Sequence, residues 1–537
     1  MKKLLTKMAC IQKFIKRDYI LLVDNVLNDG AELCDNYALF EYLQSKPEYK
    51  DISFYVINKR SSQYDEIKNK YPKNIIPVNG SKVSYALIKK LVRTKYWLDS
   101  FQVINKFSSN LKRYLNMSDI TTVYTQHGIN FMKIAPLEEG IGIGDQTFDK
   151  IVMANEKERQ FFKRYYGFND KNVILAGLSR WDNMKIANND EEKSIFVYLT
   201  FRRYLIDTKG IKVELTDYIK NVADLCSSER LSNILKAKNI KLHVAVHHLV
   251  SSHLGDINLP NIELVDEKDI GKYKPKASLF VTDYSSMSFD YMFNDIPVIY
   301  YRLDYKNPIL AVNWGDRVNE ANAESNNDKV YNVFYDKDSV IDKIEYYCNN
   351  GFQLEDEYKK INDKFFTYRE NIRQHIIEGL LSSPDNIPND CDREPAKDIE
   401  YNKEYSFSDD FLPEVSTENL SRPAKCGKKT KQRNARLWFK LPSKAASDVV
   451  FNLEPRLGKK VKKTAFKIYL NDKFIDRITL KTNDEISIPI TTEDTEKKIQ
   501  KVEFIADNVN FISKQFKAPE CKKLNLNIKT IKVQEQM

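Results

Sequence analysis

Short apolar runs recur along most of the chain, separated by longer stretches in which polar and apolar residues are mixed. The runs are YILLVD at 19, ISFYVI at 52, TTVYT at 121, KIVM at 150, NVILA at 172, SIFVYL at 194, KLHVAV at 241, SLFVT at 278 and PVIYY at 297. They are continuous rather than alternating, which is the pattern of strands that a parallel sheet buries on both faces. The stretches between them are long enough to cross over as helices. We therefore predict the α/β class.

The number of these strand-like runs exceeds what one doubly wound sheet ordinarily holds. We therefore expect two Rossmann-like lobes, with the break near residues 179–189. The first lobe is predicted at 1–180 and the second at 181–381. A ligand would then lie in the cleft between the lobes.

The pattern changes after residue 381. Residues 382–400 place three prolines among acids and amides, which predicts a linker. Beyond it, apolar and polar residues alternate in FKIYLND, FIDRITL, ISIPI, KVEFIA and LNLNIKTIKV. Alternation is typical of antiparallel strands, so we predict a β-sandwich over 401–537.

The positive charge of the chain belongs to its C-terminal part. The net charge is +10, while residues 421–537 alone carry 27 Lys and Arg against 13 Asp and Glu. Such a face binds an anionic polymer, an acidic membrane surface or nucleic acid, or is simply solvated, and charge does not choose among these. Residues 1–17 carry six cations and no acid, with an apolar helical stripe. They predict a helix that lies on an anionic membrane or packs on the protein.

The cysteines point to a reducing compartment. All seven are far apart in the sequence and none forms a Cys-x-x-Cys pair. Neither a disulfide framework nor a zinc site is therefore predicted. No stretch approaches the roughly 18 consecutive apolar residues of a membrane span, and no secretory signal is recognisable. We expect a cytoplasmic protein.

The first candidate for chemistry is the His127-Gly128 pair, which directly follows the run TTVYT. Open α/β sheets place their ligands at the carboxyl ends of parallel strands, and a glycine there lets the backbone approach a ligand. A neutral His127 would serve as a general base toward an acceptor hydroxyl. The alternative is a structural histidine in a turn.

The second candidate is His247, after the run KLHVAV. Four of the six histidines lie between 243 and 253, but no His-Glu-x-x-His or cysteine partner accompanies them. We therefore expect no metal site. A histidine that contacts a phosphate and a purely structural cluster both remain open.

The third candidate is the segment from Thr282 to Asp290, where small hydroxyl residues lie between a strand and a helix. It predicts either a phosphate cradle or ordinary helix capping by Ser285 or Ser286. Arg180 and Arg202 also follow apparent strands, so cations, histidines and hydroxyls gather at strand ends. This convergence predicts a site for a pyrophosphate-bearing substrate. No P-loop or Gly-x-Gly-x-x-Gly motif lies near a strand end, which argues against an ATPase or a dinucleotide oxidoreductase.

Over residues 20–375 the chain resembles the CDP-glycerol glycerophosphotransferase family, which includes teichoic acid polymerases and primases. The last and longest of the similar segments is the most specific, because it runs through a strand, a turn, a helix and the next strand. The segments are Asp35-Asn36 in GAELCDNYALFEYL, TQHGINFMK at 125, FDKIVMANEKERQFFKRYYGF at 148, AGLSRWD at 176, YLTFRR at 198, VHHLV at 246, VDEKDI at 265 and VTDYSSMSFDYMFNDIPVIYYRLDY at 281.

The resemblance implies a GT-B fold and transfer of glycerol phosphate from CDP-glycerol to an acceptor hydroxyl, with release of CMP. It implies that His127 is the base and that His247 lies near the phosphates. Neither a cofactor nor a metal is implied. The residues that it places in substrate binding are Gly128, Asn130, Lys133, Arg180, Thr200, Phe201, Arg202, Thr282, Ser285, Ser286 and Asp290.

The chain departs from the family pattern at three places. Leu199 precedes Thr200 where proline is usual, Ser179 replaces a proline, and Gln126 stands where many members have tryptophan. The donor is therefore open between CDP-glycerol, CDP-ribitol and another CDP-linked polyol.

The expected partners are this donor, a glycan or lipid-linked acceptor and an anionic membrane surface at the inner face of the cell membrane, but no nucleic acid. The C-terminal segments FKIYLNDKFIDRITL and CKKLNLNIKTIKV are similar to jelly-roll modules of bacterial surface-polysaccharide enzymes. Such a module would hold an anionic glycan or lie against lipid phosphates, or it would be a structural or dimerising appendage. Two rival functions remain: a GT-B glycosyltransferase that uses a sugar nucleotide, and a non-catalytic protein that binds anionic polymers.

Overall fold

The computed structural model describes most of the α/β part and the strands of the C-terminal part. The basic segment at residues 1–14 and most of the predicted linker, at 383–394, lie outside the described residues. The described residues are 15–25, 35–80, 82–101, 111, 118, 120–129, 148–166, 172–184, 193–200, 217–245, 254, 259–266, 269–304, 332–382, 395, 398–407, 415–418, 428–429, 434–443, 445–455, 464–506 and 526–535.

The first sheet has seven parallel strands in the order β3-β2-β1-β4-β5-β6-β7. The strands are β1 (Tyr19–Val23), β2 (Ser53–Asn58), β3 (Ile75–Val78), β4 (Thr94–Asp99), β5 (Thr121–Tyr124), β6 (Lys150–Met153) and β7 (Val173–Leu175). The helices between them are α2 (Asp35–Gln44), α3 (Tyr64–Lys70), α4 (Tyr85–Leu91) and α6 (Glu156–Tyr166), and the short 3₁₀ helix η2 (Ser179–Asp182) follows β7.

The second sheet has six parallel strands in the order β10-β9-β8-β11-β12-β13. The strands are β8 (Ser194–Tyr198), β9 (Lys241–Ala245), β10 (Ile262–Val265), β11 (Leu279–Thr282), β12 (Val298–Tyr301) and β13 (Asn332–Phe334). The helices are α7 (Asp217–Cys226), α8 (Glu229–Ala237), α10 (Ile270–Tyr273), η6 (Lys274–Lys276), α11 (Ser288–Phe293), α14 (Lys337–Asn349) and α15 (Asp356–Phe365).

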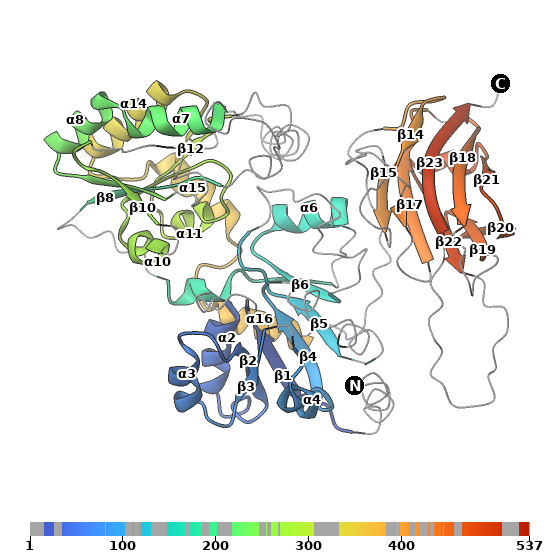
Figure 1. Ribbon diagram of the computed structural model, residues 1–537, viewed down its shortest axis with the longest axis horizontal. Helices are drawn as coiled ribbons and strands as arrows, with labels where there is room; N and C mark the ends of the chain where they lie inside the picture. Colours follow the sequence, from blue (N-terminus) through green and yellow to red (C-terminus); the bar gives the residue numbers. More distant parts are fainter. Residues whose placement is uncertain are drawn as a thin grey trace.

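Burial explains why the apolar runs were continuous in the sequence. Every residue of β2 and of β5 is buried, because helices cover both faces of the sheets. On the second sheet, α7, α8 and α14 lie together over one face (Figure 1) and share a hydrophobic cluster with Ile195, Val197 and Val281. Phe196 and Phe280 point to the other face and belong to the cluster that contains the core of the first sheet. The prediction of two parallel sheets in an α/β chain is confirmed.

The helix α16 (Ile372–Ser382) follows the second sheet in the chain but packs on the first (Figure 1). A β-carbon on its Gly379 would lie 2.5 Å from Cγ2 of Ile174 in β7, so only glycine allows this approach. The N–H of Ile372 donates to the Asp182 carboxylate at 2.8 Å. The chain therefore passes between the two sheets twice.

The C-terminal part contains two antiparallel sheets, in agreement with the predicted alternation. One has the order β14-β23-β18-β21, with β16 also on β23, and the other has the order β15-β17-β22-β19-β20. The Phe451 and Phe504 rings, one from each sheet, lie 5.3 Å apart in a shared hydrophobic cluster. The elements are β14 (Glu404–Ser406), β15 (Val415–Glu418), β16 (Lys428–Lys429), β17 (Asn434–Lys440), β18 (Ser447–Pro455), β19 (Thr464–Leu470), β20 (Lys473–Leu480), β21 (Asp484–Ile490), η8 (Asp494–Glu496), β22 (Ile499–Ala506) and β23 (Leu526–Glu535).

A tight turn joins β19 to β20. Its central residues, Asn471 and Asp472, have φ angles of 49° and 72°. Two successive positive φ angles are characteristic of the turn that suits the twist of a hairpin, and Asn and Asp tolerate them better than other non-glycine residues. None of the described helices of the chain combines the length and the apolar composition that a membrane crossing requires.

Candidate active site

The Asp24 carboxylate, just after β1, organises the start of α2. It accepts the backbone N–H groups of Asn36 at 3.2 Å and Tyr37 at 2.9 Å. The hydroxyls of Tyr55 and Ser100 also donate to it. Burial raises the pKa of Asp24, while these four hydrogen bonds oppose the shift. A carboxylate at a helix N-terminus satisfies the unpaired N–H groups there, so Asp24 fixes α2 at the carboxyl edge of the first sheet.

Asn36 connects this helix to the strand that precedes His127. Its amide donates to the Val23 carbonyl at 2.8 Å, and its oxygen accepts the Thr125 hydroxyl at 2.9 Å. Both Asn36 and Thr125 are buried. The end of β1 and the segment after β5 are thus held by side-chain hydrogen bonds of Asn36, in addition to the backbone hydrogen bonds between the strands.

Gln126 makes the turn that presents His127. Its φ angle of 62° lies in the left-handed region, which costs free energy for a residue other than glycine. The fully buried side chain donates to the Val152 carbonyl at 2.6 Å and to the Glu158 carboxylate at 3.0 Å. The sequence marked Gln126 only as a departure from the family pattern; in the structure it anchors the loop on α6.

His127 is exposed, with one face of its ring stacked on Phe101 at a centroid distance of 4.2 Å. Its Nδ1 lies 2.8 Å from the carbonyl oxygen of Ser100. Because a carbonyl only accepts, Nδ1 carries the proton, and the basic lone pair of the neutral ring is on Nε2. The hydrogen bond and the stacking together fix the ring orientation and the tautomer, as a general base requires.

Gly128 brings the loop of His127 against the second sheet. An ideal β-carbon at this position would lie 2.6 Å from the Oγ of Ser286, in the turn between β11 and α11. A contact of that length requires the Ser286 side chain to turn away or the loops to move, so glycine lets the two loops meet as they do. The structure thus brings His127, Gly128 and Ser286 to one place, as the sequence predicted.

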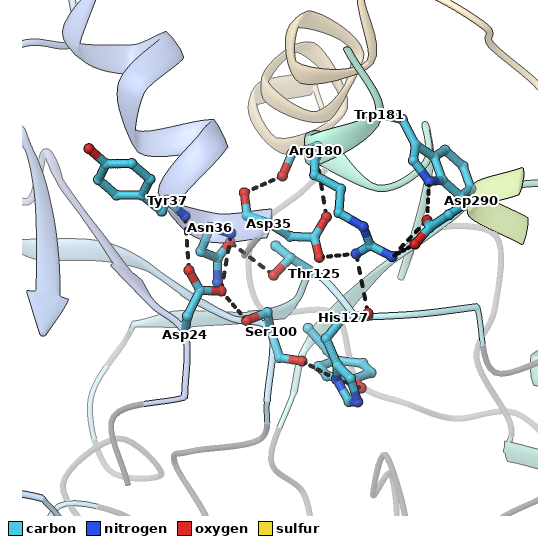
Figure 2. A network of polar contacts seen from close by, with 12 residues as sticks. Asp24, Asp35, Asn36, Tyr37, Ser100, Thr125, His127, Arg180, Trp181 and Asp290 are labelled. Atoms are coloured by element: carbon cyan, nitrogen blue, oxygen red, sulfur yellow. Dashed lines mark hydrogen bonds and ion pairs between the residues drawn. The ribbon is translucent and has the colours of Figure 1, made fainter. Parts of the chain in front are cut away.

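Arg180 links both sheets to the His127 loop (Figure 2). Its Nη1 donates to the Asp35 carboxylate at 2.5 Å and to the His127 carbonyl at 3.2 Å. Its Nη2 donates to both oxygens of Asp290, at 2.9 and 3.1 Å. The guanidinium is a partly buried junction between α2, α11 and the loop after β5.

Asp290, in the first turn of α11, receives three donors. Besides Arg180, they are Nε1 of Trp181 at 2.7 Å and Nζ of Lys274 at 2.5 Å. Burial alone would raise the pKa of Asp290, but the charges of Arg180 and Lys274 and the hydrogen bonds of Lys274 and Trp181 outweigh it and lower the pKa to about 2. Asp290 is therefore ionised at neutral pH and serves to bind Arg180.

Asp35 shares Arg180 with Asp290 but has a different electrostatic environment. Burial raises its pKa to about 6, and the Arg180 charge only partly offsets this because Asp24 and Asp290 are also negative. The sequence identified Asp35 as part of the family resemblance but gave it no role. The sequence feature that could have indicated a role for Asp35 is its position in the first turn of a helix that follows a strand.

At the carboxyl edge of the second sheet, Asp283 connects the residues that follow β8 and β11 by hydrogen bonds. Its carboxylate accepts the N–H of Thr200 at 2.9 and 3.1 Å and that of Tyr284 at 2.6 Å. The Thr282 hydroxyl donates to the Tyr198 carbonyl at 2.6 Å, and the Ser285 hydroxyl accepts the N–H of Met287 at 3.3 Å. The Ser285 contact belongs to the turn before α11, whose N-cap Met287 receives no side-chain cap hydrogen bond, and Thr200 lies at the same edge.

Five predicted site residues lie outside the described residues: Asn130, Lys133, Phe201, Arg202 and His247. In the described part of the chain, no group of three or more His, Cys, Asp or Glu side chains is arranged to hold a metal ion. The described geometry offers a positioned base, a partly buried network in which Arg180 and Lys274 pair with the carboxylates of Asp35 and Asp290, and hydroxyl groups across two loops. Such a site suits proton transfer from a hydroxyl to His127.

Comparison with known proteins places these features in a family. The sequence profile described as CDP-Glycerol:Poly(glycerophosphate) glycerophosphotransferase matches residues 5–378. Among curated proteins of Bacillus subtilis (strain 168), the minor teichoic acid biosynthesis protein GgaB is 26% identical over 383 residues, covering 67% of this chain and 39% of its own length. The teichoic acid poly(glycerol phosphate) polymerase is 24% identical over 302 residues, covering 50% and 37% respectively.

The chain spans about two fifths of the length of the curated relatives that it matches. Among solved structures, that of the wall teichoic acid polymerase TagF is similar with a TM-score of 0.47 and 14% identity, over 71% of this chain and 92% of that one.

Proposed function

This chain belongs to the CDP-glycerol:poly(glycerophosphate) glycerophosphotransferase family, as its motifs predicted, and from this membership we propose that it is a polyol-phosphate transferase. It moves glycerol phosphate, or a related polyol phosphate, from a CDP-linked donor to a hydroxyl of a teichoic-acid-like or other surface-glycan acceptor. CMP is the second product.

The observation that carries this proposal is the fixed tautomer of His127. The hydrogen bond from Nδ1–H to Ser100 leaves the basic lone pair on Nε2 of an exposed ring. In the proposed step, Nε2 takes the proton of the acceptor hydroxyl while the oxygen attacks the phosphorus that bears the polyol. The bond from that phosphorus to the bridging oxygen breaks, and its electron pair leaves with CMP.

Arg180 contributes as a positioning residue. It binds the His127 carbonyl and, through Asp35 and Asp290, connects the base to α2 and α11. Ser286 lies against Gly128 from the opposite loop, so a donor held at the second sheet would reach the base. These contacts support a GT-B arrangement with the donor on the second lobe and the acceptor beside His127.

The C-terminal antiparallel sheets would form a basic sandwich that holds the anionic product or lies against lipid phosphates. The charge of residues 421–537 supports this role. The enzyme would then work in the cytoplasm, at the inner face of the membrane.

The test is CMP release from CDP-glycerol and from CDP-ribitol, with and without a phosphorylated glycan or lipid-linked primer. We expect release that depends on the primer and on one of the two donors. Release from a sugar nucleotide instead, in the same assay, would favour a glycosyltransferase. Binding of anionic polymer without turnover of any donor would favour the non-catalytic alternative.

A further inference from the structure

A buried guanidinium lies at the carboxyl edge of the second sheet and has no role in the network around Arg180. Arg302 directly follows β12 and is 3% exposed. Within the described part of the chain, neither its Nη1 nor its Nη2 has a hydrogen-bond partner. Burying a charged group without a partner costs several kcal/mol, and native proteins seldom accept this cost without a functional reason.

Aromatic rings surround this cation but do not satisfy its donors. The guanidinium lies 4.0 Å from the centre of the Tyr284 ring and 5.2 Å from that of Tyr300. Rings stabilise a cation through their faces and leave its N–H groups unpaired. Burial lowers the pKa of Arg302, which the neighbouring Tyr284, Tyr300 and Asp283 oppose. An arginine nevertheless stays protonated in proteins.

The nearby Asp283 carboxylate is engaged elsewhere. It accepts the N–H groups of Thr200 and Tyr284, which connect the ends of β8 and β11. Asp283 thus stabilises the loop ends, and it makes no hydrogen bond to Nη1 or Nη2 of Arg302. Among the residues that the structure describes, no group pairs with the two terminal nitrogens of the guanidinium, which are thus available to a bound anion.

Strand register shows which way Arg302 points. Thr282 in β11 pairs with Tyr300 in β12, so Tyr284 and Arg302 lie next to each other just beyond the strands. The N–H of Arg302 donates to the Phe334 carbonyl at 2.8 Å, which fixes its backbone against β13. Because side chains alternate along a strand, Arg302 lies on the same face as Tyr300. Tyr300 belongs to the cluster that includes the core of the first sheet, so this face is turned toward the first sheet.

We propose that Arg302 binds the phosphate of the nucleotide donor that leaves as CMP. This inference rests on the proposed function and adds a phosphate-binding residue to it. Ser285 and Ser286, which follow Tyr284, would lie beside the same phosphate. When the bridging bond breaks, its electron pair stays on an oxygen of CMP. A guanidinium has two parallel N–H donors that can both bind this oxygen and stabilise its growing negative charge. The ligand would also remove the cost of the unpaired cation.

The experiment measures binding of inorganic pyrophosphate, CDP and cytidine to the full chain and to Arg302→Met, by calorimetry. We expect about 10- to 100-fold weaker binding of pyrophosphate and CDP, with cytidine unchanged, because charged hydrogen bonds are lost. Arg302→Lys keeps the charge and the contact with the rings but loses the fork, and we expect several-fold weaker pyrophosphate binding. Arg230→Met is the matched control, because Arg230 is an exposed arginine of α8 that pairs with Asp342 and Glu345 on α14.

The outcomes separate this inference from the proposed function. Wild-type affinity for pyrophosphate and CDP in Arg302→Met, or in Arg302→Lys should the Met variant not fold, overturns the inference alone. Pyrophosphate binding that depends on Arg302, without any binding of CDP, supports the anion site and overturns the CDP-linked donor. A wild-type chain that binds neither probe overturns both.

Discussion

Ser286 occupies the space in front of Gly128 that the β-carbon of any other residue would fill. The distance from that β-carbon to Ser286 would be 2.6 Å for Oγ and 3.3 Å for Cβ. The two residues come from different sheets and are 158 positions apart, so the size of residue 128 controls how closely the loops of the site approach. This contact joins the predicted base to the predicted donor loop.

We predict that Gly128→Ala lowers the free energy of unfolding by about 1–3 kcal/mol, because the added methyl group forces the two loops apart. Urea unfolding measures the change. Ser286→Ala, which removes the Oγ at 2.6 Å, should recover most of the loss in the double variant, although alone it changes little. Additive effects of the two substitutions would show that the clash does not exist.

We predict that His127→Ala lowers the rate of CMP release by about 10²- to 10⁴-fold, the range for removal of a general base. The KM for the donor should change much less, because the ring accepts the proton of the acceptor. The assay is primer-dependent CMP release. His375→Ala is the control, since His375 lies on α16 and stacks on Tyr368 away from the loop after β5. Undiminished turnover in a folded His127→Ala chain would remove the assigned role.

We predict a specific pH dependence of stability from Asp35. Its pKa is raised from 3.8 to about 6 in the folded chain. The folded state therefore holds the proton more tightly than the unfolded chain, and the free energy of unfolding falls as pH rises from about 4 to about 6. The contribution is about 3 kcal/mol and is constant outside this window.

Urea unfolding of the wild type and Asp35→Asn at several pH values tests this contribution. The variant should lack this part of the slope, because an amide does not titrate in the range. Asp356→Asn, at an exposed position in α15, serves as the control and should keep the wild-type slope. Parallel pH profiles for wild type and Asp35→Asn would contradict the raised pKa.

We predict that Asp290→Asn lowers the free energy of unfolding by about 3–5 kcal/mol, because it leaves Arg180 and Lys274 without their shared carboxylate in a buried site. Asp363→Asn breaks an exposed pair with Arg369 and should cost at most about 1 kcal/mol. Denaturant midpoints measure both. Equal small losses for the two variants would mean that the Asp290 network is as weak as a surface pair.

The sequence was sufficient for the features that depend on local pattern. Buried strands such as β2 and β8 are continuous apolar runs, and the Asn471-Asp472 turn is a short-range signal. His127 was predicted as a site residue because it directly follows a strand, and carboxyl ends of parallel strands share one edge. These inferences need no knowledge of which segments meet in space.

The features that the sequence did not reveal depend on contacts between distant segments. Nothing local indicates that Gln126 adopts a left-handed conformation held by Glu158, or that Asp35 and Asp290 share one arginine. In the sequence Arg302 looks like an ordinary residue after a strand. Its burial, and the absence of hydrogen-bond partners for Nη1 and Nη2 among the described residues, arise only when neighbouring strands surround it. The backbone conformation, ion pairing and burial of these residues depend on which distant segments pack around them, and residue type alone does not reveal this.

The return of α16 to the first sheet has a consequence for synthesis of the chain. Ile174 in β7 is covered by Gly379 of this helix, and Ile372 N–H pairs with Asp182. A ribosome must therefore translate the whole second sheet before the first can be completed. Nascent chains that end before residue 372 would expose an apolar strand face, and such intermediates are prone to aggregate. The first sheet begins folding early but is finished only when residues 372–382 emerge.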